Sequence, residues 1–315
     1  MLSRVADSLY WMARYLERAE NTTRMIDANV QILLELKPQA VERQLRRVNE
    51  SLGAPLDVSG GITVPELEAA LIFDASTPAS IINSIMQARE NARQVREQIS
   101  SEMWSGLNGL YHFVKQYDHD DLDQELPLDF LSEVRKKISL FKGEMDSTMS
   151  HGEEWRFLQI GRHLERAEAM SSMLRAHCGE LCGKAEIDDL ELLALLRSAN
   201  AFEAYLKKYT AAIESEKIVE FLVLNPEHPY SVLYAAKRLS QDVSTLPEGG
   251  LRRKRLQVER VVGRFAASLE FSSVDEIVSA DLAEALAGVN EHCVQLHNAL
   301  HETYIDYPIE GSLPS

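Results

Sequence analysis

The chain has 315 residues, of which 45% are hydrophobic and 26% charged, and its formal net charge is −16. This acidic balance argues against binding to nucleic acid or to an anionic membrane, because both need a basic protein surface. No apolar run is long enough to span a bilayer, the segment Met1–Tyr15 lacks a signal peptide's apolar stretch, and three cysteines fit a reducing compartment, so we expect a cytoplasmic protein.

The first predicted element is one long helix that begins at Ser3, a plausible N-cap, and continues to Leu36 before Pro38 ends it. Its apolar residues recur at spacings of three and four, which is the pattern of one buried helix face. They are Leu9, Met12, Leu16, Ala19, Thr23, Ile26, Val30 and Leu33. The small side chain of Ala19 at the middle of this face would let another helix approach closely.

The rest of the first half reads as a loop and two further helices. Glycines between Gly53 and Gly61 indicate an irregular connection. A long helix is predicted from Pro78, in its first turn, to about Met103, with Gly106 and Gly109 ending it. An acidic loop, 118–125, then precedes a helix over Asp129–Met149.

The second half repeats this plan, with Pro229 in the first turn of one helix as Pro78 is in the first half. Its predicted helices are Gly152–Leu181, Asp189–Ala212, Lys217–Leu224, Pro229–Val243, Leu251–Leu269 and Leu282–Tyr304. No segment shows the sustained alternation of a strand, so the sequence predicts an all-α protein. The tail from Asp306 is expected to be loose.

A seven-residue phrase occurs twice. Residues 14–20 read RYLERAE and residues 162–168 read RHLERAE, at an offset of 148. A second similarity, between 71–82 and 222–233, has an offset of 151. Two matches in the same order at nearly the same offset indicate a duplicated unit. We therefore predict related halves, 1–149 and 150–305, that form one integrated domain with pseudo-twofold symmetry, followed by the tail 306–315.

The repeated phrase places like charges next to one another on a helix, because residues three and four apart are neighbours. Arg14 and Arg18 are such a pair, and Arg162 and Arg166 repeat it. If a twofold axis joins the two helices, the arginines of one copy meet the glutamates of the other in a specific ion network. On this interpretation Glu17, Arg18, Glu165 and Arg166 are mostly buried and paired. A solvated face and a ligand site are the alternatives.

A second group of arginines lies at Arg89, Arg93 and Arg96, on one face of the helix predicted from Pro78. Three stacked arginines repel one another unless a carboxylate or an anion lies close, although an exposed mixed face is the alternative. The candidate ligand-binding residues are therefore Arg14, Glu17, Arg18, Asn21, Arg89, Arg93, Arg162, Glu165 and Arg166.

Other residue patterns do not predict a metal or a cofactor. Cys178 and Cys182 lie one helical turn apart, as do His297 and His301, but neither pair has the further ligands that a zinc site needs. The nucleophile elbow, the phosphate-binding loop and the dinucleotide fingerprint are all absent from the sequence. Catalytic residues cannot be chosen from these patterns.

The chain resembles the alpha-E family of bacterial helical proteins over nearly its whole length. The opening segment 2–12, followed by the first copy of the phrase and Asn21, is the most specific part of this resemblance. Further matching segments are 88–93, Trp104, Asn108, 162–168, 197–200, 220–222, Pro229 and Ser231. One position departs: the family usually has arginine before the serine of the second Pro-x-Ser, where this chain has Tyr230.

The resemblance implies which proteins this one works with, but not which reaction it takes part in. Proteins of this family resemble partners that are encoded beside, or fused to, circularly permuted ATP-grasp ligases. Transglutaminase-like proteins often accompany them. We therefore expect an auxiliary or adaptor subunit of a system that forms peptide or other amide bonds, holding an anionic or peptide-like group in a charged cleft. One alternative is an enzyme that uses Glu17 or Glu165 as general acid and base, with arginines that clamp the substrate. The other is a scaffold without a ligand site.

Overall fold

The computed structural model describes residues 2–33, 35–54, 56, 61–117, 129–183, 187–209, 213–247 and 252–305. Within these ranges the chain is helical and contains no strand, so the predicted all-α class is confirmed. No helix in the described part of the chain has the length and apolarity needed to cross a bilayer. The predicted acidic loop (118–125) and the predicted loose tail (306–315) both lie outside the described residues.

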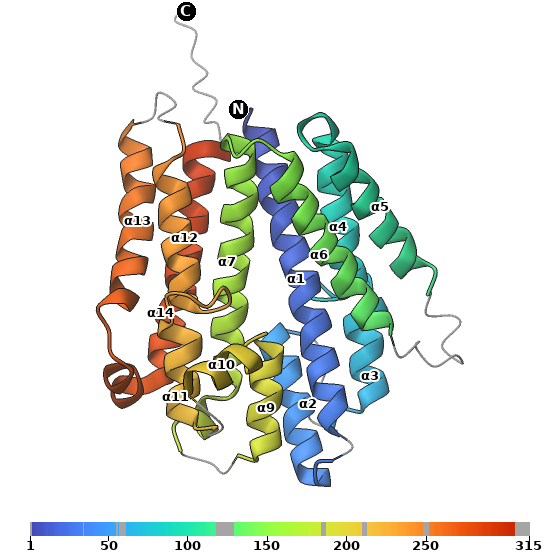
Figure 1. Ribbon diagram of the computed structural model, residues 1–315, viewed down its shortest axis with the longest axis vertical. Coiled ribbons are helices and arrows are strands. Elements are labelled where there is room, and N and C mark those ends of the chain that lie inside the picture. The colour runs from blue at the N-terminus through green and yellow to red at the C-terminus, as the bar shows by residue number, and fades with distance from the viewer. Residues whose placement is uncertain are drawn as a thin grey trace, which may run out of the picture.

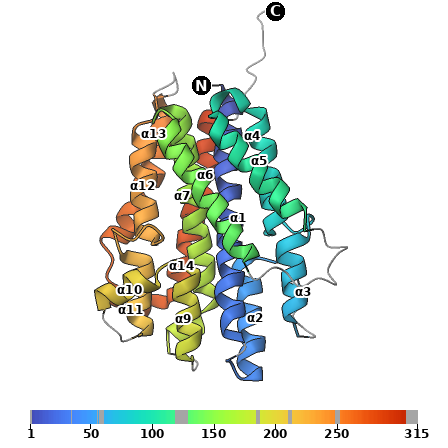
Figure 2. The same ribbon diagram turned by 45° about the vertical axis from the view of Figure 1, so that its right-hand side comes forward.

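Two long helices, α1 (Ser3–Leu33) and α7 (Glu153–Ala176), run side by side through the middle of the molecule (Figure 1). The helices that follow α1 cover one flank of this pair and those that follow α7 cover the other, as Figure 2 also shows. The first flank contains α2 (Pro38–Leu52), α3 (Val64–Glu68), α4 (Ile81–Gln94), α5 (Ser101–Lys115) and α6 (Phe130–Thr148). The second contains α8 (Cys178–Leu181), α9 (Asp189–Ser198), α10 (Phe202–Tyr209), α11 (Ser215–Val219), α12 (Val232–Ser244), α13 (Arg252–Glu270) and α14 (Val274–Leu300).

The central pair approaches closely because small residues lie between the two backbones. Ala19 and Ala167 are both fully buried, as their position on the apolar face suggested. Gly161 makes the tightest contact, since a Cβ atom at this position would lie 2.3 Å from the carbonyl oxygen of Tyr10. That distance is shorter than any tolerated contact, so a larger side chain at Gly161 would push α1 and α7 apart.

Several local features recur in the two halves. One π-helical segment covers Ala69–Phe73 and another covers Glu220–Leu224. The following helices begin at Ser80 and Ser231, each of which caps its helix by accepting a backbone N–H three residues ahead. These recurrences fit the predicted duplication at the second offset, while superposition of the complete halves remains a prediction.

Several predicted helix boundaries are wrong. The long helix predicted from Pro78 ends at Gln94, because Ser100 caps a new helix, and Gly106 and Gly109 lie inside α5 rather than at a break. Pro78 and Pro229 each lie two residues before the N-cap serine, in the preceding turn rather than in the helix.

Two further errors concern helices of the second half. The helix predicted over Asp189–Ala212 breaks at Asn200, whose φ of 52° is left-handed. The last helix begins at Val274 rather than Leu282, and Asp281 has a non-helical backbone inside it. Neither break contains proline or glycine, so no strong sequence signal predicts it.

Candidate functional site

The two copies of the repeated phrase face each other across the contact between α1 and α7. Glu165 accepts a hydrogen bond of 2.6 Å from Nε of Arg14 through one carboxylate oxygen. Its other oxygen accepts one of 2.6 Å from Nε of Arg18. Arg14 also donates to Glu168. We call Arg14, Arg18, Glu165 and Glu168 the Glu165 cluster.

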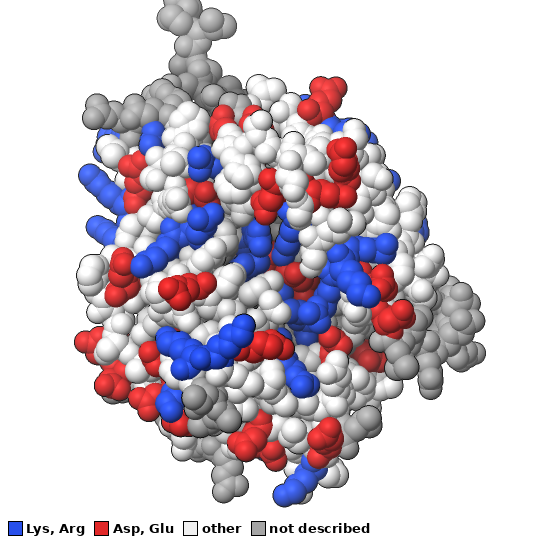
Figure 3. Space-filling view, viewed as in Figure 1, with Lys and Arg blue, Asp and Glu red and all other residues white. Residues whose placement is uncertain are grey.

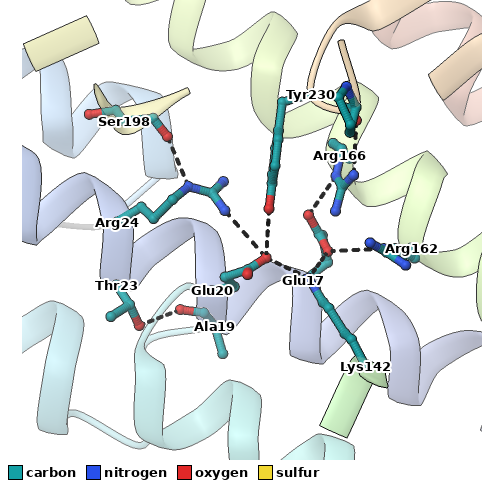
Figure 4. A network of polar contacts seen from close by, with 11 residues as sticks. Glu17, Ala19, Glu20, Thr23, Arg24, Lys142, Arg162, Arg166, Ser198 and Tyr230 are labelled. Atoms are coloured by element: carbon teal, nitrogen blue, oxygen red, sulfur yellow. Dashed lines mark hydrogen bonds and ion pairs between the residues drawn. The ribbon is translucent and has the colours of Figure 1, made fainter. Parts of the chain in front are cut away.

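The reciprocal contacts form around Glu17 (Figure 4). Arg166 donates its Nε to Glu17 at 2.7 Å, and Nζ of Lys142 on α6 donates to the second carboxylate oxygen at 2.7 Å. Nε of Arg162 lies 3.8 Å from the same oxygen. The predicted pairing of arginines from one copy with the glutamate of the other is therefore confirmed. Glu17, Glu165 and Arg166 are buried as predicted, whereas the side chain of Arg18 is 24% exposed.

Glu20 extends this network beyond the motif. It accepts a 2.5 Å hydrogen bond from Lys142 and a 3.3 Å bond from the hydroxyl of Tyr230. The ring of Tyr230 also lies against two guanidinium groups, 4.4 Å from that of Arg24 and 4.0 Å from that of Arg166. Tyr230 thus fills the space between them, as Figure 4 shows. The Glu17 cluster denotes Glu17, Glu20, Arg24, Lys142, Arg162, Arg166 and Tyr230.

These neighbours keep the central glutamates ionised. Burial alone would raise the pKa of Glu17, but the charges of Arg166 and Lys142 outweigh it and hold the pKa well below its usual value. Burial likewise opposes ionisation of Glu165, and Arg14 and Arg18 lower its pKa overall. Glu168 behaves differently, because burial raises its pKa despite the contact with Arg14.

The two clusters differ in charge balance. The Glu17 cluster has four cations and two carboxylates, whereas the Glu165 cluster has two of each. Within the described part of the chain, one buried guanidinium nitrogen of each arginine in the Glu17 cluster has no hydrogen-bond partner. These atoms are Nη1 of Arg24, Nε of Arg162 and Nη2 of Arg166. Two of these nitrogens still form ion pairs, because Nη1 of Arg24 lies 3.3 Å from Glu20 and Nε of Arg162 lies 3.8 Å from Glu17. The Glu17 cluster therefore has an excess of positive charge, and its arginines have donors that make no hydrogen bond.

Each cluster lies beside a cavity. Arg24 of the Glu17 cluster lines one of about 230 Å³, together with Arg135 and Arg197. Arg18, Glu165 and Glu168 of the other cluster line one of about 280 Å³. In Figure 3, basic and acidic side chains meet in a hollow near the middle of the face, where α1, α6 and α7 run together in Figure 1.

The candidate residues are only partly brought together. Asn21 is buried beside the Glu165 cluster and lines its cavity. Arg89 lies elsewhere: its Nε donates to Asn108 at 2.6 Å, and its guanidinium lies 4.6 Å from the ring centre of Tyr111 on α5. Arg93 is 62% exposed and pairs with Glu90. The idea that Arg89 and Arg93 line the same cleft as the repeated motif is therefore wrong, because their helix turns them toward α5 and solvent.

Among the described residues, no three His, Cys, Asp or Glu side chains gather in a way that could hold a metal ion. Cys178, the first residue of α8, and Cys182, directly after α8, are free thiols. His297 contacts the hydroxyl of Tyr10 at 2.8 Å, in an aromatic group beneath the start of α1.

Four members of the Glu17 cluster were not among the candidate residues, namely Glu20, which belongs to the repeated phrase, and Arg24, Lys142 and Tyr230 outside it. Lys142 lies more than 120 positions from both of its carboxylate partners, and no local pattern connects them. Arg24 continues the face of α1 one turn beyond Glu20, so helical spacing could have included it. Tyr230 stood out only as a departure from the family pattern.

Comparison with known proteins places this arrangement in a family. A protein of Mycobacterium bovis is 24% identical over 337 residues, and two strains of Mycobacterium tuberculosis have proteins matching to the same extent; all three are uncharacterised. The alignment covers 97% of this chain but only 37% of each relative. No solved structure matches the chain.

Residues 1–305 match the family described as a predicted alpha-helical domain with a conserved ER motif. Glu-Arg dipeptides stand at the centre of both copies of the repeated phrase, as Glu17-Arg18 and Glu165-Arg166, and both take part in the reciprocal network. Since the match extends over almost the entire sequence, the chain belongs to the Alpha-E family.

Proposed function

We propose that this protein is an adaptor subunit of an ATP-grasp-linked system that forms peptide or other amide bonds, and that its Glu17 cluster holds an anionic group of a peptide-like substrate. The observation that carries the binding part is the excess of cations over carboxylates in that cluster, together with buried guanidinium nitrogens that make no hydrogen bond within the described residues. A carboxylate or phosphate oxygen is the acceptor that such donors bind most strongly.

The adjoining cavity gives an anion access to Arg24, the member of the Glu17 cluster that lines it. Arg24 contributes both to the cluster and to the cavity wall, where Arg135 and Arg197 add positive charge nearer to solvent. Arg135 is partly neutralised, since its Nη1 lies 3.0 Å from Asp27. Glu203 also lines the cavity, so its wall carries three arginines against two carboxylates, which leaves an excess of one positive charge.

The state of the central glutamates favours binding over proton transfer. Both carboxylate oxygens of Glu17 and of Glu165 already accept hydrogen bonds from cationic side chains. A general acid or base works best with a pKa near the working pH and a free oxygen directed at the substrate. The lowered pKa of each glutamate runs against that role.

The partner is proposed on different grounds. The family resemblance implies a circularly permuted ATP-grasp ligase, with a transglutaminase-like protein as a further associate. The curated relatives are consistent with a module that works beside other protein segments, because the aligned helical region makes up only 37% of each of them. The adaptor would present its bound anionic group to the ligase.

Calorimetry with an acidic dipeptide and with inorganic phosphate tests the binding proposal. We expect binding that weakens as ionic strength rises. Replacing Arg197 with Gln should lower the affinity about 10-fold or more, the effect of one lost charge-assisted hydrogen bond. Arg93→Gln is the matched control, since it removes an exposed arginine from a different face. Equal effects of both substitutions, or no binding of either probe, would contradict the proposal.

The ligase association needs its own experiment. The protein should co-purify with an ATP-grasp ligase encoded beside it and should change the rate at which that ligase consumes ATP with an acidic acceptor. An unchanged rate and separate elution of the two proteins would remove the adaptor part of the proposal, whatever the calorimetry shows.

A purely structural scaffold is the second candidate, and one observation favours it. Arg14, Arg18 and Arg166 each donate to a glutamate of the opposite copy, so much of the motif is satisfied internally. Buried ionic groups can serve only to fix the register of two helices. If the protein neither binds an anion nor associates with a ligase, the scaffold function is the one that remains.

A further inference from the structure

The cavity beside the Glu165 cluster has the composition of a separate binding site. It has a volume of about 280 Å³ and lies between the end of α2, the turn before α4 and the middle of α7. This volume is at the lower limit of ordinary ligand pockets, which suits a molecule of a few heavy atoms rather than a long peptide.

Two buried polar side chains on its wall lack partners. Asn21 is 8% exposed and Ser51 is 6% exposed. Among the described residues, neither the amide of Asn21 nor the hydroxyl of Ser51 makes a hydrogen bond, but only the Ser51 oxygen is also inaccessible to water. Buried polar groups in folded proteins are nearly always hydrogen-bonded, so the Ser51 hydroxyl indicates a missing polar partner, and the Asn21 amide on the same wall is available to bind one.

Charges of both signs also line the cavity. Arg18 directs its Nε to Glu165, and its terminal nitrogens make no hydrogen bond within the described residues. Glu50 is exposed at the end of α2, and Glu168 has one oxygen held by Arg14. One available guanidinium therefore faces the same space as two carboxylates with free oxygens.

We infer that this cavity binds a small zwitterion, namely a free α-amino acid. The terminal nitrogens of Arg18 and the amide of Asn21 would take the carboxylate, and Glu50 and Glu168 would take the ammonium group. Ser51 can donate or accept at the centre of the site. This site is distinct from the Glu17 cluster and does not require the proposed anion binding there.

The second half of the chain shows how this cavity could be closed. Ala79, on the cavity wall, corresponds at the offset of 151 to Tyr230, whose ring fills the space beside Arg166 in the Glu17 cluster. The small side chain of Ala79 leaves the comparable space open beside Arg18. A tyrosine at this position should occupy the cavity without removing any of the ion pairs.

The test is calorimetry of the whole protein with the individual L-amino acids, and with acetate and methylamine as the separate halves of the zwitterion. We expect at least one amino acid to bind and both halves to bind far more weakly. Ala79→Tyr should abolish binding, and Asn21→Leu should weaken it about 3- to 10-fold, as for a lost neutral hydrogen bond.

Glu50→Gln provides a variant that preserves folding, because Glu50 is exposed, and it should weaken binding about 2- to 5-fold. Glu90→Gln, an exposed carboxylate on α4, is the matched control and should change nothing. Arg197→Gln should also leave amino-acid binding intact, which separates this site from the proposed anion site. The inference is overturned if no amino acid binds at millimolar concentration, or if binding survives Ala79→Tyr and Glu50→Gln unchanged.

Discussion

The Glu17 and Glu165 clusters are built from the same seven-residue phrase and nevertheless differ chemically. Each has a central glutamate held by arginines of the opposite copy. Around Glu17, however, Lys142 and Arg24 add positive charge and Tyr230 fills the space, whereas Ala79 leaves a cavity beside the Glu165 cluster. The repeated phrase therefore determines which arginines and glutamates pair between the copies. Residues outside the phrase determine the net charge of each cluster and whether a cavity opens beside it.

The largest expected effect comes from neutralising the central glutamates. Glu17→Gln and Glu165→Gln should each lower the free energy of unfolding by about 3–5 kcal/mol, because buried cations lose their counter-charge. The loss should be greater for Glu17, which has three cationic neighbours, than for Glu165, whose partner Arg18 is partly exposed. Urea denaturation measures both. Equal losses would show that the clusters do not differ in the way described. If the free energy of unfolding changed by only a few tenths of a kcal/mol, the network would add little to stability.

A smaller effect is expected at the helix contact on which both clusters depend. Gly161→Ala should destabilise the protein by about 1–3 kcal/mol, because the added methyl group overlaps the backbone of Tyr10. Gly109→Ala in α5 is the control: nothing lies within 4 Å of a Cβ there, and the substitution should stabilise by about 0.4–1 kcal/mol. Thermal melting of the two variants would refute the close contact if both behaved alike.

The last glutamates of the two copies should respond oppositely to neutralisation. The pKa of Glu20 is lowered, because Lys142 outweighs the effect of burial, so Glu20 stabilises the fold above its unfolded pKa of about 4.3. That contribution is lost as the pH falls through the lower folded pKa. Glu20→Gln should therefore cost about 1–3 kcal/mol at neutral pH.

Burial raises the pKa of Glu168, so its ionisation opposes folding. This penalty is absent below the unfolded pKa of about 4.3 and complete above the folded pKa. Glu168→Gln should accordingly leave stability unchanged at acidic pH and maintain or raise it at neutral pH. Melting curves across this range test the contrast, and parallel pH profiles for the two variants would contradict it.

The reciprocal pairing could be predicted from the sequence because it follows from two local facts. The phrase recurs, and its arginines are one helical turn apart, so each copy needs carboxylates from elsewhere. The π-helical segments Ala69–Phe73 and Glu220–Leu224 and the kink at Asp281 had no comparable signal, since such irregularities depend on tertiary contacts.

The composition of each cluster beyond the phrase could not be predicted. Arg89 looked equivalent to the motif arginines because it lies in a charged helical stripe, yet its helix presents it to Tyr111 and Asn108. No pattern in the sequence marks Lys142, but α6 packs beside α1 and brings it to Glu17 and Glu20. Sequence spacing predicts which residues share one face of a helix, but it does not predict which other helix packs against that face.

A double-mutant cycle between Glu17 and Arg166 tests the reciprocal network most directly. The free energy of unfolding would be measured for Glu17→Gln, Arg166→Gln and the double variant, with Glu90 and Arg93 as the exposed control pair. We predict a coupling energy of about 2–3 kcal/mol for the buried pair and at most about 0.5 kcal/mol for the control. A coupling at Glu17 and Arg166 no larger than that of the exposed pair would contradict the account.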